Sequence, residues 1–184
     1  MPALPGQTAL IVVDVQDGLD EPRLGRRNNP DAERNIARLL AEWRTRGRPI
    51  FHVQHMSTRP DSPLRSDQPG NAIKRIVAPQ GEEPVIPKTV NCAFVGTDLE
   101  ARLRAAGVHT VVIVGLTTQH CISSTARMAS DLGFATVVVD DATATHDSRS
   151  YDGSYYPAEV VHAVSLASLH GEFAMIVQTD QLLG

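Results

Sequence analysis

The sequence predicts an α/β fold, a three-layer α/β/α, doubly wound domain with a mostly parallel six-stranded sheet. Short β-branched runs alternate along the chain with longer segments whose apolar residues recur at helical spacing. The run Val111–Val114 contains no polar residue, which is typical of a parallel strand covered on both faces. A length of 184 residues suits one compact domain, which we place over residues 1–184. Strands that alternate with helices favour parallel pairing through right-handed crossovers.

Composition narrows the class of protein. Hydrophobic residues make up 42% of the chain and charged residues 21%, as in an ordinary globular domain. The net charge is −4 and no run of Lys or Arg occurs, which argues against a nucleic acid or a membrane as partner. No apolar run approaches membrane-spanning length, and no secretory leader pattern opens the sequence. Two cysteines do not make a disulfide framework, so we expect a cytoplasmic protein.

The first half of the chain is predicted to hold three strands and one helix. The helix starts at Asn29-Pro30-Asp31, with proline at the first helical position, and ends at Gly47. Segment 18–30 is expected to be a loop, and segment 56–82 is too long for an ordinary connection, which favours a lid or a subunit contact. The predicted strands are 9–13, 49–53 and 84–88, and the apolar stripe of the helix is Ile36, Leu39, Leu40 and Trp43.

The second half continues the alternation. Thr97-Asp98-Leu99-Glu100 is predicted to be a capping box that opens a helix ending at Gly107. A further helix is predicted from Cys121 to Gly133, and another over 157–170, with a loop at 147–156. The predicted strands are 111–114, 135–139 and 173–177.

We predict the strand order 3-2-1-4-5-6, which sets the first and fourth strands side by side at a topological switch point. Ligands of such sheets bind beyond the carboxyl ends of the strands at that point. Asp14, Lys88 and the turn that carries Cys121 all lie at carboxyl ends of predicted strands. The sequence therefore predicts a site built from these three residues.

Cys121 lies between a buried strand and a helix, the setting of a nucleophile. Unpaired N–H groups and the positive end of the helix dipole are expected to favour the thiolate and lower the thiol pKa. Each residue also has a purely structural interpretation. The cysteine could pack as a small hydrophobic residue, Asp14 could cap its turn, and Lys88 could be a solvated lysine.

Three motifs occur in order along the chain: LIVVDVQ at 10–16, IPKTVNCAFVGTDLEARLRAAG at 86–107, and VIVGLTTQHCISSTARMASDLGF at 112–134. With these motifs the chain resembles the isochorismatase-like cysteine hydrolases, which include nicotinamidases, N-carbamoylsarcosine amidohydrolase and isochorismatases. The resemblance implies a catalytic triad of Asp14, Lys88 and Cys121. Cys121 would attack an amide carbonyl to form a thioester, Asp14 would move the protons, and Lys88 would hold the pair.

The resemblance also implies an oxyanion hole. A cis peptide at Leu116–Thr117 would aim the backbone N–H groups of Thr117 and Cys121 at the developing oxyanion. Phe94 is expected to line the substrate pocket or to pack in the core, and Gln16 to contact substrate or brace its loop. Cys92 lacks the strand–turn–helix setting and is expected to be structural or pocket-lining rather than nucleophilic.

A bound metal is not expected. Nicotinamidases bind a divalent ion through Asp-x-His…His after the second strand, whereas this chain has Phe51-His52-Val53-Gln54-His55 there. His52 and His55 are three residues apart on a strand, so they point to opposite faces. We therefore predict no metal and no cofactor, and nicotinamide is disfavoured as substrate. His55 can still reach the pocket to bind substrate, or it can be structural.

The leading hypothesis is a cofactor-independent cysteine hydrolase that cleaves a small amide, carbamoyl or ureido C–N bond. The alternatives are isochorismatase-type cleavage of a vinyl ether, which needs no thiol, and a non-catalytic oligomeric small-molecule binder. The family resemblance implies a homodimer or homotetramer, with contacts from 56–82 and 147–156. An anionic substrate would need an arginine, and Arg59, Arg65 and Arg149 are the open candidates.

Overall fold

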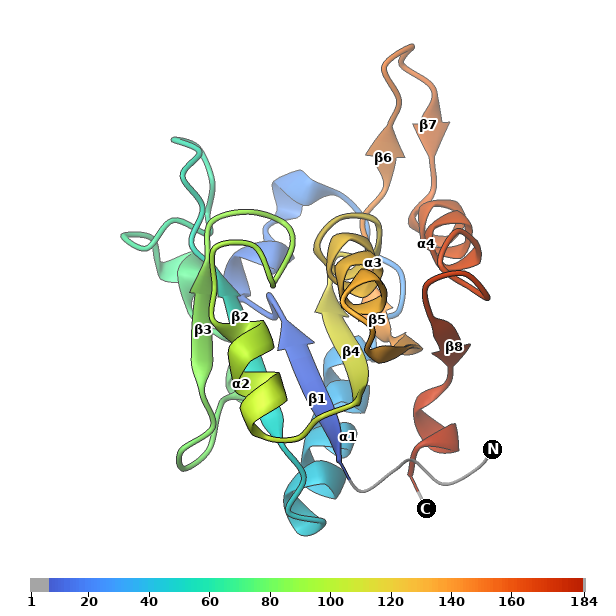
Figure 1. The fold of residues 1–184 in the computed structure, drawn as a ribbon. Helices are drawn as coiled ribbons and strands as arrows, with labels where there is room; N and C mark the ends of the chain where they lie inside the picture. Colours follow the sequence, from blue (N-terminus) through green and yellow to red (C-terminus); the bar gives the residue numbers. More distant parts are fainter. Residues whose placement is uncertain (1–6, 184) are drawn as a thin grey trace.

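The structure is a computed structural model that describes residues 7–183. Its middle layer is a parallel six-stranded sheet in the order β3-β2-β1-β4-β5-β8, with β1 and β4 paired at its centre (Figure 1). The predicted strand order is confirmed, and the sixth strand is β8 because a two-stranded hairpin precedes it. The strands of the sheet are β1 (Thr8–Val13), β2 (Ile50–His55), β3 (Val85–Lys88), β4 (Thr110–Leu116), β5 (Ala135–Ala144) and β8 (Met175–Val177).

Helices cover both faces of the sheet and complete the predicted three layers (Figure 1). The helix α1 packs on one face through the predicted stripe, all of which is buried. The other three helices pack on the opposite face. The helices are α1 (Ala32–Thr45), α2 (Leu99–Ala105), α3 (Ser123–Asp131) and α4 (Ala158–Ala167).

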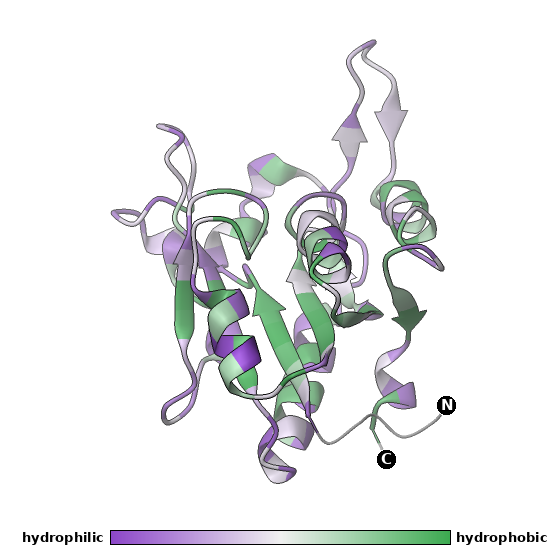
Figure 2. Cartoon of the chain, viewed as in Figure 1, coloured by the Kyte–Doolittle hydropathy of each residue, from purple (hydrophilic) through white to green (hydrophobic). Residues whose placement is uncertain are grey.

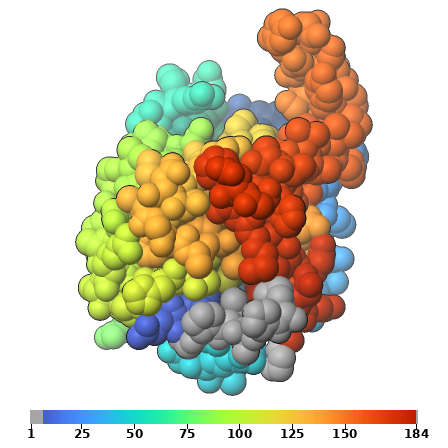
Figure 3. All heavy atoms as spheres, turned by 45° about the vertical axis from the view of Figure 1, so that its right-hand side comes forward, coloured from blue at the N-terminus to red at the C-terminus, as the bar shows by residue number. Residues whose placement is uncertain are grey.

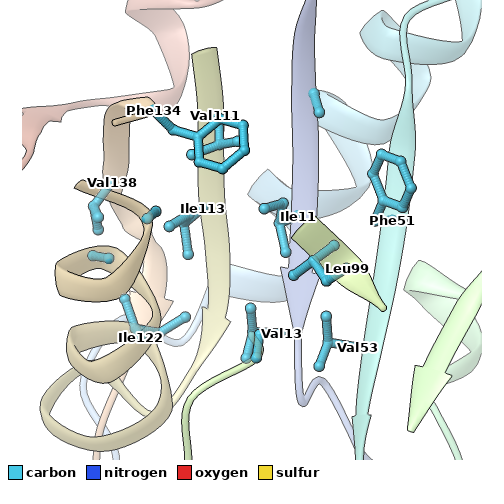
Figure 4. Close-up of a cluster of buried hydrophobic side chains, with 14 of the residues drawn as sticks. Ile11, Val13, Phe51, Val53, Leu99, Val111, Ile113, Ile122, Phe134 and Val138 are labelled. Carbon is cyan, nitrogen blue, oxygen red and sulfur yellow. The ribbon is translucent and has the colours of Figure 1, made fainter. Parts of the chain in front are cut away.

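The central strands are buried on both faces, as their apolar sequence predicts. In β1, Ile11 and Val13 point toward the core beneath α2 and α3, whereas Leu10 and Val12 point toward α1. Figure 4 shows the first of these cores, and Figure 2 shows the continuous hydrophobic colour of the central strands. Burial of both faces makes the sheet a rigid platform for the groups at its carboxyl edge.

Gly115 lets β1 and β4 approach closely next to that edge. Its φ is +123°, and an added Cβ would lie 2.0 Å from the carbonyl oxygen of Val13. Any side chain here would push the two central strands apart, so glycine is required at this position.

Several local predictions differ from the structure. The capping box is wrong, since Asp98 is the N-cap of α2 without a side-chain cap bond, and Thr97 Oγ1 instead donates to Ala93 and accepts from Leu99 N–H. The strand β5 runs on to Ala144, past a register shift against β4 between Ile113 and Gly115. A short π-helical turn, Thr118–Ile122, precedes α3, so Cys121 lies in that turn rather than in the helix.

Segment 147–156, predicted as a loop, forms a hairpin of β6 (Ser148–Arg149) and β7 (Tyr155–Tyr156). It projects from the body of the molecule (Figures 1 and 3). Segment 56–82 has no strand but contains short 3-10 turns at Pro69–Asn71 and Arg75–Val77. The homodimer or homotetramer stays a prediction. Among the described residues, no helix is long and apolar enough to cross a membrane.

Candidate active site

The fold brings Asp14, Lys88 and Cys121 together at the carboxyl edge of the sheet. Asp14 follows β1 directly and adopts φ +53°, a left-handed conformation that Asp tolerates better than most residues. Lys88 is the last residue of β3 and reaches past β2, and Cys121 comes from the turn after β4. All three are buried. Residues separated by more than a hundred positions therefore meet where the switch-point rule predicts.

The ammonium of Lys88 is the centre of this cluster. Its Nζ donates to Asp14 Oδ2 at 2.6 Å, to the carbonyl oxygen of Val90 at 3.1 Å and to Cys121 Sγ at 3.5 Å. It also lies 3.1 Å from Nδ1 of His55. Burial and the charge of Lys88 lower the pKa of His55 to about 4, so this imidazole is neutral.

The Asp14 carboxylate keeps one oxygen open. Oδ2 accepts from Lys88, whereas Oδ1 is buried and has no hydrogen-bond partner among residues 7–183. Burial raises the pKa of Asp14 to about 6, against the opposing effect of Lys88. A carboxylate with this pKa and an unused lone pair can accept a proton near neutral pH.

The Cys121 thiol is the neighbouring proton donor, with Sγ within 4.8 Å of an Asp14 carboxylate oxygen. The expectation of a lowered thiol pKa is wrong: burial, followed by the negative charge of Asp14, raises it above its ordinary value, and Lys88 opposes this only in part. The resting site therefore holds a protonated thiol beside an ionised carboxylate, and proton transfer must accompany any attack by sulfur.

A cavity of about 700 Å³ opens over this cluster and is lined by Asp14, His55, Thr117 and Cys121. The predicted cis peptide Leu116–Thr117 is present at the end of β4. Thr117 and Cys121 thus lie together at the cavity wall, and the oxyanion role of their N–H groups stays a prediction.

Gln16 and Phe94, predicted to bind substrate, lie outside the cavity lining. The Gln16 amide accepts from the N–H of His55 at 2.8 Å and donates to its carbonyl at 3.0 Å, so it clamps the ends of β1 and β2 together. Phe94 stacks on Phe134 with ring centroids 6.1 Å apart. Cys92 is half-buried, and it too is absent from the lining.

Sequence reasoning did not single out Asn91, and it offered Arg59 only as one of three candidate arginines. Asn91 Oδ1 lies 3.8 Å from Cys121 Sγ, and its place three residues after Lys88 in the second motif was an available signal. Arg59 lines the cavity from segment 56–82, where no periodicity marks it.

The donor atoms of Asp14, His55 and Cys121 lie within 4.8 Å of one another, close enough to share a metal ion. The ammonium of Lys88 is within 3.5 Å of a donor atom in each of them, however, and so occupies the place that a cation would need. His52 points away and bonds to Glu83 at 3.0 Å. These residues do not fit a divalent ion.

Comparison with known proteins shows the family to which this chain belongs. Residues 8–180 match the model of the isochorismatase domain, and the chain belongs to the isochorismatase family of hydrolases. It is 49% identical to YrdC, an uncharacterized isochorismatase family protein of Bacillus subtilis, over 95% of this chain and 94% of that one. A solved structure of an isochorismatase family protein from Chromobacterium violaceum has a TM-score of 0.95 and 41% identity, covering 100% of this chain and 97% of the other.

Two further relatives carry names that state an activity. Streptothricin hydrolase of Streptomyces noursei is 37% identical over 76% of this chain and 50% of its own length. Maleamate amidohydrolase of Pseudomonas putida is 38% identical over 44% of this chain and 38% of its own length.

Proposed function

We propose that this protein hydrolyses the C–N bond of a small amide, carbamoyl or ureido compound through a thioester on Cys121. One observation carries the proposal: a buried ammonium bridges a carboxylate and a thiol at the floor of a cavity, and the carboxylate keeps one oxygen open. A relative named as an amidohydrolase supports the same reaction class.

The first half of the reaction transfers the acyl group to sulfur. Asp14 takes the thiol proton as Sγ attacks the carbonyl carbon, and the carbonyl electron pair moves to oxygen, where the N–H groups of Thr117 and Cys121 receive it. The tetrahedral intermediate then collapses and the C–N bond breaks. The proton on Asp14 passes to the leaving nitrogen, which departs as an amine or ammonia.

The second half releases the acid. Asp14 removes a proton from water as the water oxygen attacks the thioester carbonyl, and the C–S bond then breaks. The sulfur leaves as a thiolate that recovers the proton from Asp14, which restores the thiol and the carboxylate. Lys88 keeps its positive charge throughout and offsets the negative charge that moves between Asp14 and Cys121.

Alkylation tests the nucleophile without knowledge of the substrate. Iodoacetamide should modify Cys121 faster than Cys92, as mapped by mass spectrometry, and the difference should disappear in Asp14→Asn. Cys92 serves as the internal control, because it is half-buried and outside the cavity. If Cys121 reacts no faster than Cys92 while the cavity is accessible, the covalent mechanism is wrong.

Turnover separates the competing functions. A panel of amides, with maleamate and streptothricin included, should give a substrate whose hydrolysis falls by about 10³-fold or more in Cys121→Ala but persists in Cys92→Ser. Hydroxylamine should trap the acyl group as a hydroxamate. A vinyl-ether hydrolase would survive loss of the thiol, and a binder would turn over nothing in the panel. Dialysis against EDTA should leave the rate unchanged.

A further inference from the structure

The cavity keeps an excess positive charge after the ion pairs and hydrogen bonds of its acidic lining residues are taken into account. Asp14 and Asp147 are the acidic residues in its lining. Asp14 pairs with the buried Lys88. Asp147 lies at the base of the hairpin and is engaged by Arg26 at 3.1 Å, by the Tyr155 hydroxyl at 2.6 Å and by the N–H of Ala158 at 2.7 Å. Neither carboxylate is left to neutralise a further cation.

The histidines of the lining add no positive charge at neutral pH. Burial is the main cause that lowers the pKa of His55, His120 and His146. The positive charge of Arg59 contributes to this lowering at both His55 and His120, so its guanidinium acts across the cavity beside the Cys121 turn.

Among the charged side chains that the structure describes in the cavity lining, Arg59 is the cation without an acidic partner. It is exposed and lines the cavity, and its guanidinium makes no hydrogen bond or ion pair with another residue in the range 7–183. The two other candidate arginines lie outside the lining. Arg65 bonds to Asp67 at 3.0 and 2.7 Å, and Arg149 stacks over Tyr155 at 5.8 Å. The structure thus separates three arginines that the sequence leaves equivalent.

Tertiary bonds hold the segment that carries Arg59. Asn71 Nδ2 donates to the carbonyl of Leu64 at 2.7 Å and to that of His55 at 3.0 Å, which ties the far end of the segment to the end of β2. The N–H of Ser57 donates to the Leu64 carbonyl at 3.0 Å and closes the loop around Arg59. The guanidinium is therefore presented at the mouth of the cavity by an anchored loop.

From these observations we propose that Arg59 binds a carboxylate of the substrate, and that the substrate is a small amide bearing such a group at its other end. The identification of the amide rests on the proposed function, whereas the anion site rests on the charges of the cavity. One unpaired guanidinium matches one carboxylate in charge, and its planar fork suits two parallel hydrogen bonds. Arg59 would set the specificity and orient the substrate, and Cys121 would remain the group that reacts.

A pair of alkylating reagents tests the anion site directly. Iodoacetate and iodoacetamide react alike, with the sulfur forming a bond to carbon, iodide leaving and Asp14 taking the proton, but only iodoacetate carries a carboxylate. The rate with iodoacetate divided by the rate with iodoacetamide is measured at Cys121 and normalised to the same ratio at Cys92. This normalised ratio should fall about three- to tenfold in Arg59→Gln. Arg59→Lys should recover part of it, because a lysine keeps the charge and loses the fork.

Arg75→Gln is the matched control, since Arg75 is an exposed arginine of the same segment that lies outside the cavity lining. Its ratio should stay within about twofold of the wild type, as expected for an exposed charge away from the site. An unchanged ratio in Arg59→Gln, or an equal fall in both variants, would overturn the proposal.

If Cys121 reacts with neither reagent, the thioester mechanism is wrong. The role of Arg59 is then tested separately, by measuring ligand binding. Calorimetry on Cys121→Ala would compare the monoamides of three- to five-carbon dicarboxylic acids with the uncharged diamides. The proposal predicts tighter binding of a monoamide, lost in Arg59→Gln. It is wrong if no monoamide binds more tightly than its diamide. For an active enzyme, the same substitution should raise KM for carboxylated amides far more than it lowers kcat.

Discussion

Two buried lysine–carboxylate clusters in this molecule have the same contact distance, but the pKa of the carboxylate is shifted in opposite directions in the two. Lys88 meets Asp14 at 2.6 Å beneath the cavity, and Lys74 meets Glu33 at 2.6 Å at the start of α1. Burial raises the pKa of Asp14 to about 6. The pKa of Glu33 is lowered to about 2, because its hydrogen bonds and ion pairs outweigh the effect of burial.

The difference lies in how completely each carboxylate is satisfied. Glu33 accepts from Arg27 through both oxygens, at 2.5 and 2.7 Å, and from Lys74 as well. Asp14 has one cationic partner and a bare Oδ1. Two cations fix the charge of Glu33 and make the cluster a structural anchor for segments 18–30 and 56–82. A single cation leaves Asp14 able to exchange a proton near neutral pH.

The largest expected contrast comes from removing each lysine in turn. Lys88→Met removes the main effect that opposes burial at Asp14, so the pKa of Asp14 rises further and the base is protonated at pH 7. Alkylation of Cys121 and hydrolysis of an amide substrate should both fall about 10²- to 10⁴-fold. Rates measured at pH 7.5 on folded protein, verified by circular dichroism, check this.

Lys74→Met should lower the stability of the protein and leave the reactivity of Cys121 nearly unchanged. It removes one of two cations from Glu33 and should lower the free energy of unfolding by about 2 kcal/mol, with the Cys121 alkylation rate within about threefold of wild type. Urea unfolding and alkylation on the same preparation measure both. Equal losses of reactivity in the two variants would show that the clusters are not functionally distinct.

A smaller effect is expected from pH. Because Asp14 titrates at about 6, the alkylation rate of Cys121 should fall about tenfold per pH unit below that value and flatten above it. The raised thiol pKa means that the plateau reflects proton transfer to Asp14 rather than free thiolate. In Asp14→Asn the rate should instead rise steadily to high pH. A wild-type profile without an inflection near 6 would argue against Asp14 as the base.

The two clusters also show what the sequence could and could not predict. Asp14, Lys88 and Cys121 lie at the carboxyl ends of strands whose order obeys the switch-point rule, so their meeting could be predicted. The raised pKa values of Asp14 and Cys121 could not, because they depend on burial, and the helix-dipole argument gave the wrong direction for the thiol. The sequence offered Arg59 only as one of three candidate arginines and could not choose among them, because hydrogen bonds between residues distant in sequence place its segment.

The same holds for local structure. The strand β5 continues through Asp140 and Asp141, where the polar sequence predicted an end, because tertiary partners satisfy both side chains. Asp140 accepts from His162 on α4, and Asp141 accepts from the N–H of Thr179. The periodicity of a sequence indicates burial along one element. It cannot show where a group from another element forms a hydrogen bond with a polar residue and so allows the strand to continue.

The last expected difference between the clusters is in how their contribution to stability depends on pH, and its sign separates them. A lowered pKa means that Glu33 contributes stability above pH 4.5, which is lost as the pH falls toward 2. Glu33→Gln should therefore destabilise the protein by up to about 3 kcal/mol at pH 7, and the deficit should shrink below pH 4.5. Asp14 has the opposite linkage: its contribution is present below pH 3.8 and is lost as the pH rises through about 6. Urea unfolding between pH 3 and 7 measures the difference between wild type and Glu33→Gln. A deficit that does not depend on pH would mean that Glu33 acts through packing alone, and the contrast with Asp14 would then reduce to geometry.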